Sequence, residues 1–154
     1  MRRHWQYLKY VLRHKWFVFV ACLKLGVPIW IAILHDWDKF MPDEWFPYSK
    51  CFYKPNGEKR YLETPEFTAA WNAHQKRNKH HWQYWLITWD RGTTDALPMP
   101  EVFRREMLAD WRGAGRALGK PDTLSWYRDN RNKMILHPVT RARIERDLGY
   151  SEVG

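Results

Sequence analysis

The chain has 154 residues, and its 26 lysines and arginines against 17 aspartates and glutamates give a formal net charge of +9. Aromatic side chains make up 17% of the residues, which excludes an intrinsically disordered chain because such chains are poor in large apolar groups. The length fits one domain, residues 1–154, with a hydrophobic core of its own.

Apolar residues at three- and four-residue steps predict a first helix over residues 3–25. A second helix is expected from 28 to 40, with Pro28 in its first turn, and a short third helix from about 42 to 53. Residues 54–59 have the composition of a turn or loop. Thr64 followed by Pro65 then predicts the start of a helix over 65–89.

The second half of the chain continues the helical pattern. A loop over 90–95 precedes predicted helices at 100–118, 122–133 and 138–148. Pro138 stands at the start of the last helix and Gly149 just past its end. Because the sequence has no convincing strand alternation or internal repeat, the predicted fold class is all-α.

The run Trp16–Leu34 is apolar except for one lysine and has about the length of a transmembrane helix. Lys24, Gly26 and Pro28 fall in its middle, however, and Pro28 should end or kink a helix. Two buried helices joined by a turn therefore explain this run better than a membrane span.

A secretory signal peptide ending near Cys22 is a second membrane-directed interpretation. Its cleavage would discard His14, a candidate metal ligand. Cys22 and Cys51 have no metal-type spacing and resemble small buried apolar groups in a reducing compartment. We therefore expect a cytoplasmic protein with no membrane association, in the host cytoplasm if the chain comes from a phage.

The strongest chemical signal is the segment 34–40, which reads Leu-His-Asp-Trp-Asp-Lys-Phe. Adjacent His35 and Asp36 can both bind metal where the backbone bends locally or where neighbouring helices add ligands. His14 precedes this pair and Asp110 follows it. Imidazole and carboxylate groups together predict one or two divalent ions of Fe, Mn, Zn, Ni or Mg.

The predicted helix over 65–89 carries three more histidines. His74 and His81 lie on one face at i and i+7, while His80 points about 100° away from His81. His74 and His81 are therefore the candidate ligands, and His80 lines the pocket or supports a ligand from outside. Which of His80 and His81 binds metal stays open.

Asp110 follows the apolar step Met107-Leu108-Ala109, so its carboxylate should point into the bundle. A buried carboxylate is costly unless it is paired or bound to metal. Its alternative role is to pair with Arg112 or another basic residue.

In chain order these residues form a pattern H…HD…H…H…D that resembles the HD-domain superfamily of phosphohydrolases over residues 4–115. His35-Asp36 followed by Lys39 also resembles the HDxxK element of the HD-GYP branch. The whole chain is similar to a small uncharacterised family found in phages and bacteria, with HDxSKF-like and NxHHxxYW-like motifs. These motifs correspond here to residues 35–40 and 78–85.

The resemblance implies an HD-domain-like helical bundle with a metal site between its helices. It also implies that one metal is held by His14, His35, Asp36 and Asp110. Asp36 would bridge to a second metal held by His74 and His81.

The same resemblance assigns catalytic roles to Asp36 and Lys39. Contacts with substrate phosphate are expected from Lys39, His80, Arg112 and Arg116. In the alternative interpretation, Lys39 pairs with a nearby carboxylate at 43 or 44 and the two arginines lie on a solvated face.

Three further carboxylates are possible general acids or extra ligands: Asp38, Glu44 and Glu66. Asp38 is the weaker candidate because it lies opposite Asp36 on an ideal helix. Glu44 is better placed, just after the turn that ends the predicted helix over 28–40.

Four functions are consistent with these residues. The first is a metal-dependent phosphohydrolase acting on a small anionic substrate such as a nucleotide, and the second is an HD-type di-iron oxygenase, which iron content and oxygen-dependent turnover would reveal. A non-enzymatic binder of nucleic acid or protein would bind less well at high salt. A peripheral membrane protein led by Trp16–Leu34 would partition with membranes.

Overall fold

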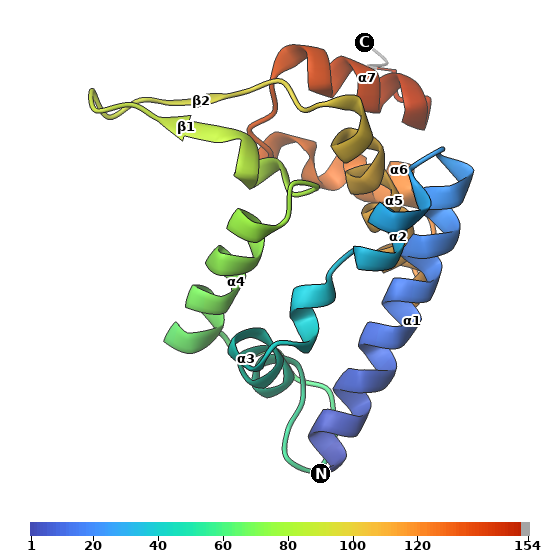
Figure 1. Cartoon of the computed structure of the whole chain (residues 1–154), viewed down its shortest axis with the longest axis vertical. Coiled ribbons are helices and arrows are strands. Elements are labelled where there is room, and N and C mark those ends of the chain that lie inside the picture. The colour runs from blue at the N-terminus through green and yellow to red at the C-terminus, as the bar shows by residue number, and fades with distance from the viewer. Residues whose placement is uncertain (152–154) are drawn as a thin grey trace.

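The computed structural model describes residues 1–151, and within that range the chain is mostly helical (Figure 1). The helices are α1 (Arg2–Lys24), α2 (Ile29–Leu34), α3 (Pro42–Phe52), α4 (Pro65–Arg77), α5 (Glu101–Ala117), α6 (Thr123–Asn130) and α7 (Pro138–Leu148). Short 3-10 helices span Trp37–Phe40, Trp82–Trp85 and Arg131–Lys133. One antiparallel hairpin joins β1 (Leu86–Thr88) to β2 (Thr94–Ala96), with Ile87 opposite Asp95.

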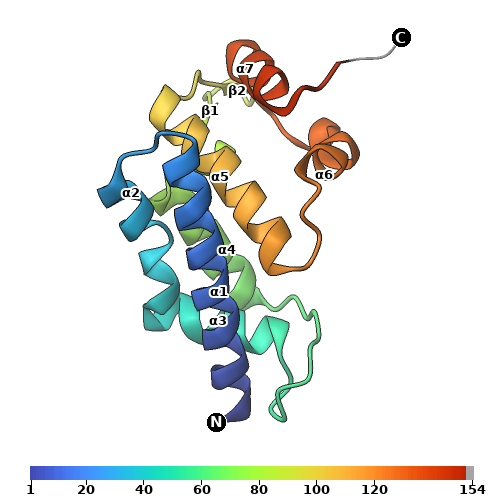
Figure 2. The same cartoon turned by 90° about the vertical axis from the view of Figure 1, so that its right-hand side faces the viewer.

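Three apolar clusters hold these elements together. One packs α1 against α3 and α4 around Tyr7 and Tyr48. A second lies around Val18 and Ala109, where α1 meets α5 and α2, and a third lies around Tyr127, between α5 and the last two helices. Figure 2 shows α6 and α7 set to one side of the α1–α5 pair.

The crossing of α1 and α5 depends on a glycine. A Cβ atom added to Gly113 would lie 2.4 Å from Val18 Cγ2 and 2.7 Å from the Val18 backbone nitrogen. Only a residue without a side chain therefore allows the two helices to come this close. Val18 is one turn after His14 and Gly113 is three residues after Asp110, so this close approach brings those two side chains together.

Most of the predicted elements are confirmed within a residue or two at each end. The predicted helix over 28–40 is wrong as a single helix, because it breaks at His35-Asp36 and resumes as a 3-10 turn. The predicted helix over 65–89 is also wrong beyond Arg77. There the Asn78 side chain donates to the His74 carbonyl oxygen at 3.0 Å and caps the helix. The last residues of the predicted range form β1 of the hairpin instead.

The two cysteines are buried free thiols, as their apolar surroundings predicted. Across residues 1–151, each helix is either too short or too polar to traverse a lipid bilayer. The hairpin projects from the body of the molecule in Figure 1, and none of its strand residues is buried.

Candidate metal centre

Histidines and carboxylates from five separate segments meet between α1, α4 and α5. The donors come from α1, the turn after α2, α4, the segment after α4, and α5: His14, His35, Asp36, His74, His80, His81 and Asp110. These are the six predicted metal ligands together with His80. The fold therefore gathers all the predicted donors in one place.

The turn after α2 decides how the His-Asp pair points. Asp36 has φ 53° and ψ 31°, and among residues 1–151 no other non-glycine residue has a positive φ. Aspartate tolerates this left-handed conformation better than most residues. The turn allows His35 and Asp36, adjacent in sequence, to point at the same centre, which a continuous helix does not allow.

One donor set surrounds the Oδ2 atom of Asp36. His14 Nε2 lies 3.1 Å from this oxygen and His35 Nε2 lies 3.4 Å from it. Asp110 Oδ1 completes the set, 3.3 Å from His14 Nε2 and 3.5 Å from His35 Nε2. Two imidazoles and two carboxylates thus face one point.

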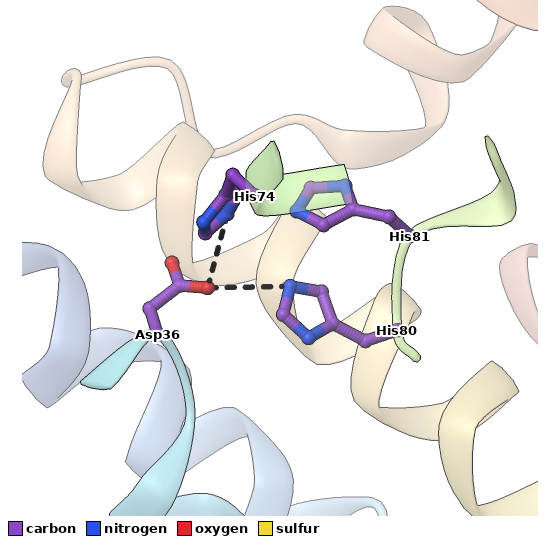
Figure 3. Close-up of side chains that lie close together, drawn as sticks. All are labelled: Asp36, His74, His80 and His81. Carbon is purple, nitrogen blue, oxygen red and sulfur yellow. Dashed lines mark ion pairs between the residues drawn. The ribbon is translucent and has the colours of Figure 1, made fainter. Parts of the chain in front are cut away.

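A second donor set surrounds the other oxygen, Oδ1, of the same aspartate (Figure 3). His74 Nε2 lies 3.4 Å from Asp36 Oδ1 and His80 Nε2 lies 3.3 Å from it. The His81 ring is 4.8 Å from the His74 ring and 4.4 Å from the His80 ring, measured between centroids. The argument that His80 points away from His81 fails, because both residues lie beyond the end of α4.

The inner nitrogens have the properties of metal ligands. The Nε2 atoms of His35, His74, His80 and His81 are buried and have no hydrogen-bond partner among the described residues, as is also true of Asp36 Oδ1. Buried polar atoms without partners are costly, and an ion would satisfy all of them. Donor separations of 3.1–3.5 Å match the edge of a tetrahedron with metal–ligand bonds of roughly 2.1 Å. The residues present therefore fit one or two divalent ions.

Outer carboxylates hold the histidine rings in this orientation. Glu106 lies 2.9 Å from His35 Nδ1 and 3.4 Å from His80 Nδ1. Glu44 and Asp38 lie 2.9 Å and 3.1 Å from His74 Nδ1. When the ring donates a hydrogen bond from Nδ1–H to a carboxylate, its Nε2 lone pair is directed at the centre, as in many metal sites.

These contacts shift the pKa values of the donors. Burial lowers the pKa of His74, but hydrogen bonds to Asp38 and Glu44 outweigh it and raise the pKa to about 9. Burial likewise opposes ionisation of Asp36, yet the charges of His35 and Lys39 hold its pKa well below the ordinary value. Burial, followed by the charges of His80 and His74, keeps the pKa of His81 well below its ordinary value. Asp36 is therefore a carboxylate and His81 a neutral imidazole at neutral pH.

Lys39 belongs to this centre. Its partly buried ammonium lies 2.5 Å from Asp36 Oδ2. The alternative that Lys39 pairs with Asp43 or Glu44 is wrong, because Arg77 contacts both of those carboxylates. Lys39 thus brings a fixed positive charge to the edge of the first donor set.

Three other residues that the sequence predicted for the site lie away from the donors. Arg112 and Arg116 line a separate recess beside Ala21 and Lys24, and Arg112 donates to the Asp147 carbonyl oxygen at 3.5 Å. Glu66 is exposed in the first turn of α4. The structure does not bring these three side chains to the donors, so phosphate binding by the arginines stays a prediction.

Sequence reasoning missed Glu106 and undervalued Asp38. The signal for Glu106 was its spacing, because residues at i and i+4 share a helix face and Asp110 follows at that distance. Asp38 seemed to lie opposite Asp36 only because the helix was taken to be continuous. The left-handed turn at Asp36 instead places Asp38 against His74, and Asn78 donates to the same Asp38 oxygen at 2.5 Å.

Comparison with known protein families covers nearly the whole chain. Residues 3–149 match the family described as "Family of unknown function (DUF5662)". The chain belongs to the DUF5662 family. Neither the search of curated proteins nor the search of solved structures found a match. All the donors described above fall inside the matched range, so the centre lies within the DUF5662 domain itself.

Proposed function

We propose that this DUF5662 protein is a metal-dependent phosphohydrolase acting on a nucleotide or another small phosphoester. One observation carries the proposal: the two oxygens of a single buried carboxylate, Asp36, face two separate sets of histidine donors. A carboxylate placed in this way can bridge two ions. Two-metal sites are common among enzymes that cleave phosphoesters.

In this proposal the fold is HD-domain-like and the donors divide into two sites. His14, His35 and Asp110 hold the first ion together with Asp36. The second ion is held by Asp36, His74, His80 and His81. The contact between His80 and Asp36 supports adding His80 to the ligands, beside His81.

When bound, the ions would polarise a phosphoryl oxygen and make bound water a stronger nucleophile at neutral pH. The chain's own residues do the rest. Lys39 offers its ammonium to an anionic oxygen of the substrate at the edge of the first donor set. Asp36, kept ionised, counters the positive charge of the site, and Glu106 and Glu44 keep the histidine rings fixed.

The test is elemental analysis of protein purified without chelator or nickel affinity resin. We expect about one or two equivalents of Fe, Mn, Zn, Ni or Mg, lost in the His35→Ala and Asp36→Asn variants. His137→Ala is the matched control, since His137 caps α7 away from the donors. The metal so identified is then used in a screen of phosphoesters. A metal-free parent protein that no divalent ion stabilises against heat would refute the proposal.

A second candidate is a di-iron oxygenase, favoured by the three histidines of the second donor set, because imidazole is a common ligand of iron. Two equivalents of iron and turnover that requires oxygen, with no phosphoester hydrolysis, would favour it. A nucleic-acid or protein binder would instead retain its salt-sensitive binding in the folded His35→Ala variant.

A further inference from the structure

A cavity of about 370 Å³ opens beside the donors. His81 and Asp110 line it, and these residues belong to the second and first donor sets respectively. The volume lies in the range of small-molecule pockets, whose walls are mostly apolar with a few polar groups. A ligand in this cavity would therefore lie next to both donor sets.

Four indole rings form much of the wall, and they come from separate elements: Trp71, Trp82, Trp111 and Trp126. The rings of Trp111 and Trp126 are 5.2 Å apart between centroids, and the Trp71 ring stands edge-on to His81 at 5.3 Å. Trp126 is 42% exposed, whereas Trp71, Trp82 and Trp111 are partly buried. Aromatic walls of this kind favour flat rings, because stacking is strong whatever the identity of the ring.

The polar groups of the cavity also indicate a ligand. Gln83 Oε1 is buried and has no hydrogen-bond partner within residues 1–151. Lys120 and Lys133 stand at the rim, and neither has a carboxylate partner in the described part of the chain. Lys133 donates instead to Asn130 Oδ1 at 3.0 Å. These groups would favour a ligand with a flat ring and a negative charge.

We propose that this tryptophan-lined cavity is the subsite for an aromatic ring of the substrate, so that the centre acts on phosphoesters whose organic part carries an aromatic ring, a nucleotide base included, in preference to phosphoesters without a ring. The inference rests on the proposed function, since it assumes that the phosphoryl group binds at the donors. The apolar wall would hold the ring, and the two lysines would attract the anion. Gln83 would accept a hydrogen bond from a donor group on the ring.

The test compares two phosphonates that cannot be hydrolysed, phenylphosphonate and methylphosphonate, by calorimetric titration of the metal-loaded protein. They share the anionic group and differ in the ring. We expect phenylphosphonate to bind at least roughly tenfold tighter, within the range of aromatic stacking. Equal affinity for the two would overturn the subsite while leaving phosphoryl binding at the donors intact. If neither binds, both the subsite and the proposed function fail.

Variants locate the effect. Trp126→Ala should remove most of the preference for phenylphosphonate and leave methylphosphonate binding unchanged, whereas Trp89→Ala, on the hairpin and also 42% exposed, should change neither. Ala114→Phe fills the cavity from α5 and should abolish the same preference. Retention of the full preference by both Trp126→Ala and Ala114→Phe would overturn the inference.

The lysines are tested separately. The Lys120→Gln/Lys133→Gln double variant should weaken phenylphosphonate binding several-fold, with an effect that shrinks as salt is added. Lys76→Gln, an exposed lysine on α4, is the control. If the double variant binds phenylphosphonate at low salt as tightly as the parent protein, the two lysines do not attract the anion.

Discussion

Replacing Glu106 by glutamine tests whether an outer carboxylate tunes the centre. The glutamate orients one histidine in each donor set, His35 at 2.9 Å and His80 at 3.4 Å. Hydrogen bonds to these two rings outweigh the effect of burial and lower its pKa, so the group is ionised at neutral pH. Glutamine keeps the size and one acceptor oxygen but removes the charge.

The expected loss follows from these distances. Removing an outer-shell partner typically costs 10–100-fold in metal affinity, or about 1.4–2.7 kcal/mol. The contact with His35 lies within ordinary hydrogen-bond range, while that with His80 is longer than a good hydrogen bond. The first donor set should therefore weaken by an amount within this range, and the second set by less.

The assay is a competition titration of each ion against a chromogenic chelator at fixed pH, on metal-free protein. Glu101→Gln is the matched control, because it makes the same change on the same helix at a residue that pairs with Arg104 and Arg105. Circular dichroism checks that both variants are folded. A Glu106→Gln protein that binds metal within twofold of the parent would refute the claim that Glu106 positions the ligands.

Three further predictions follow from features of the fold. Gly113→Ala should lower the free energy of unfolding by about 1–3 kcal/mol in denaturant titrations, because its Cβ would overlap Val18; an unchanged value would show that α1 and α5 can separate freely. Metal affinity should rise up to tenfold per pH unit between about 6 and 9, because an ion must displace the proton that His74, with a pKa near 9, carries below that pH; a flat profile would contradict this. The hydrogen bond with Arg104 lowers the pKa of Glu101 from 4.5 to about 2 in the folded protein. The ionised carboxylate should therefore stabilise the fold above pH 4.5, and this contribution should be lost as the pH falls through about 2. Since this carboxylate is 39% exposed, Glu101→Gln should cost under ~1 kcal/mol at pH 7 and nothing at pH 2, and an equal cost at both would contradict the assignment.

The sequence was informative wherever local chemistry determines the outcome. Periodic apolar residues and prolines at helix starts predicted most helices, and the residue types alone pointed to the donors. The end of α4 was missed because its cap is made by Asn78, whose side chain also reaches Asp38 in a distant turn. The hairpin was missed because its strands are three residues long and have no buried residue, which leaves little alternation to detect.

The orientation of the donors required tertiary information. The reversal at Asp36 depends on a backbone conformation that neighbouring residues do not dictate, and it corrected the placement of Asp38. His81 was preferred over His80 as a metal ligand on the assumption that both lie on one helix. That helix ends at Arg77, before either histidine, so its geometry could not decide between them. The role of Glu106 appears only when α5 is placed against the turn after α2.

The donors come from helices that pack in different apolar clusters, and this arrangement has a consequence for folding. His14 and Asp110 are almost a hundred positions apart in the chain, yet their side chains lie 3.3 Å apart. An ion held between them would close a long loop, which restricts the unfolded chain in the way that a disulfide does. Without an ion, the buried Nε2 atoms of four histidines and Asp36 Oδ1 have no hydrogen-bond partner within residues 1–151, which costs stability. The ion would then act as a removable cross-link that makes three separately packed clusters unfold as one unit.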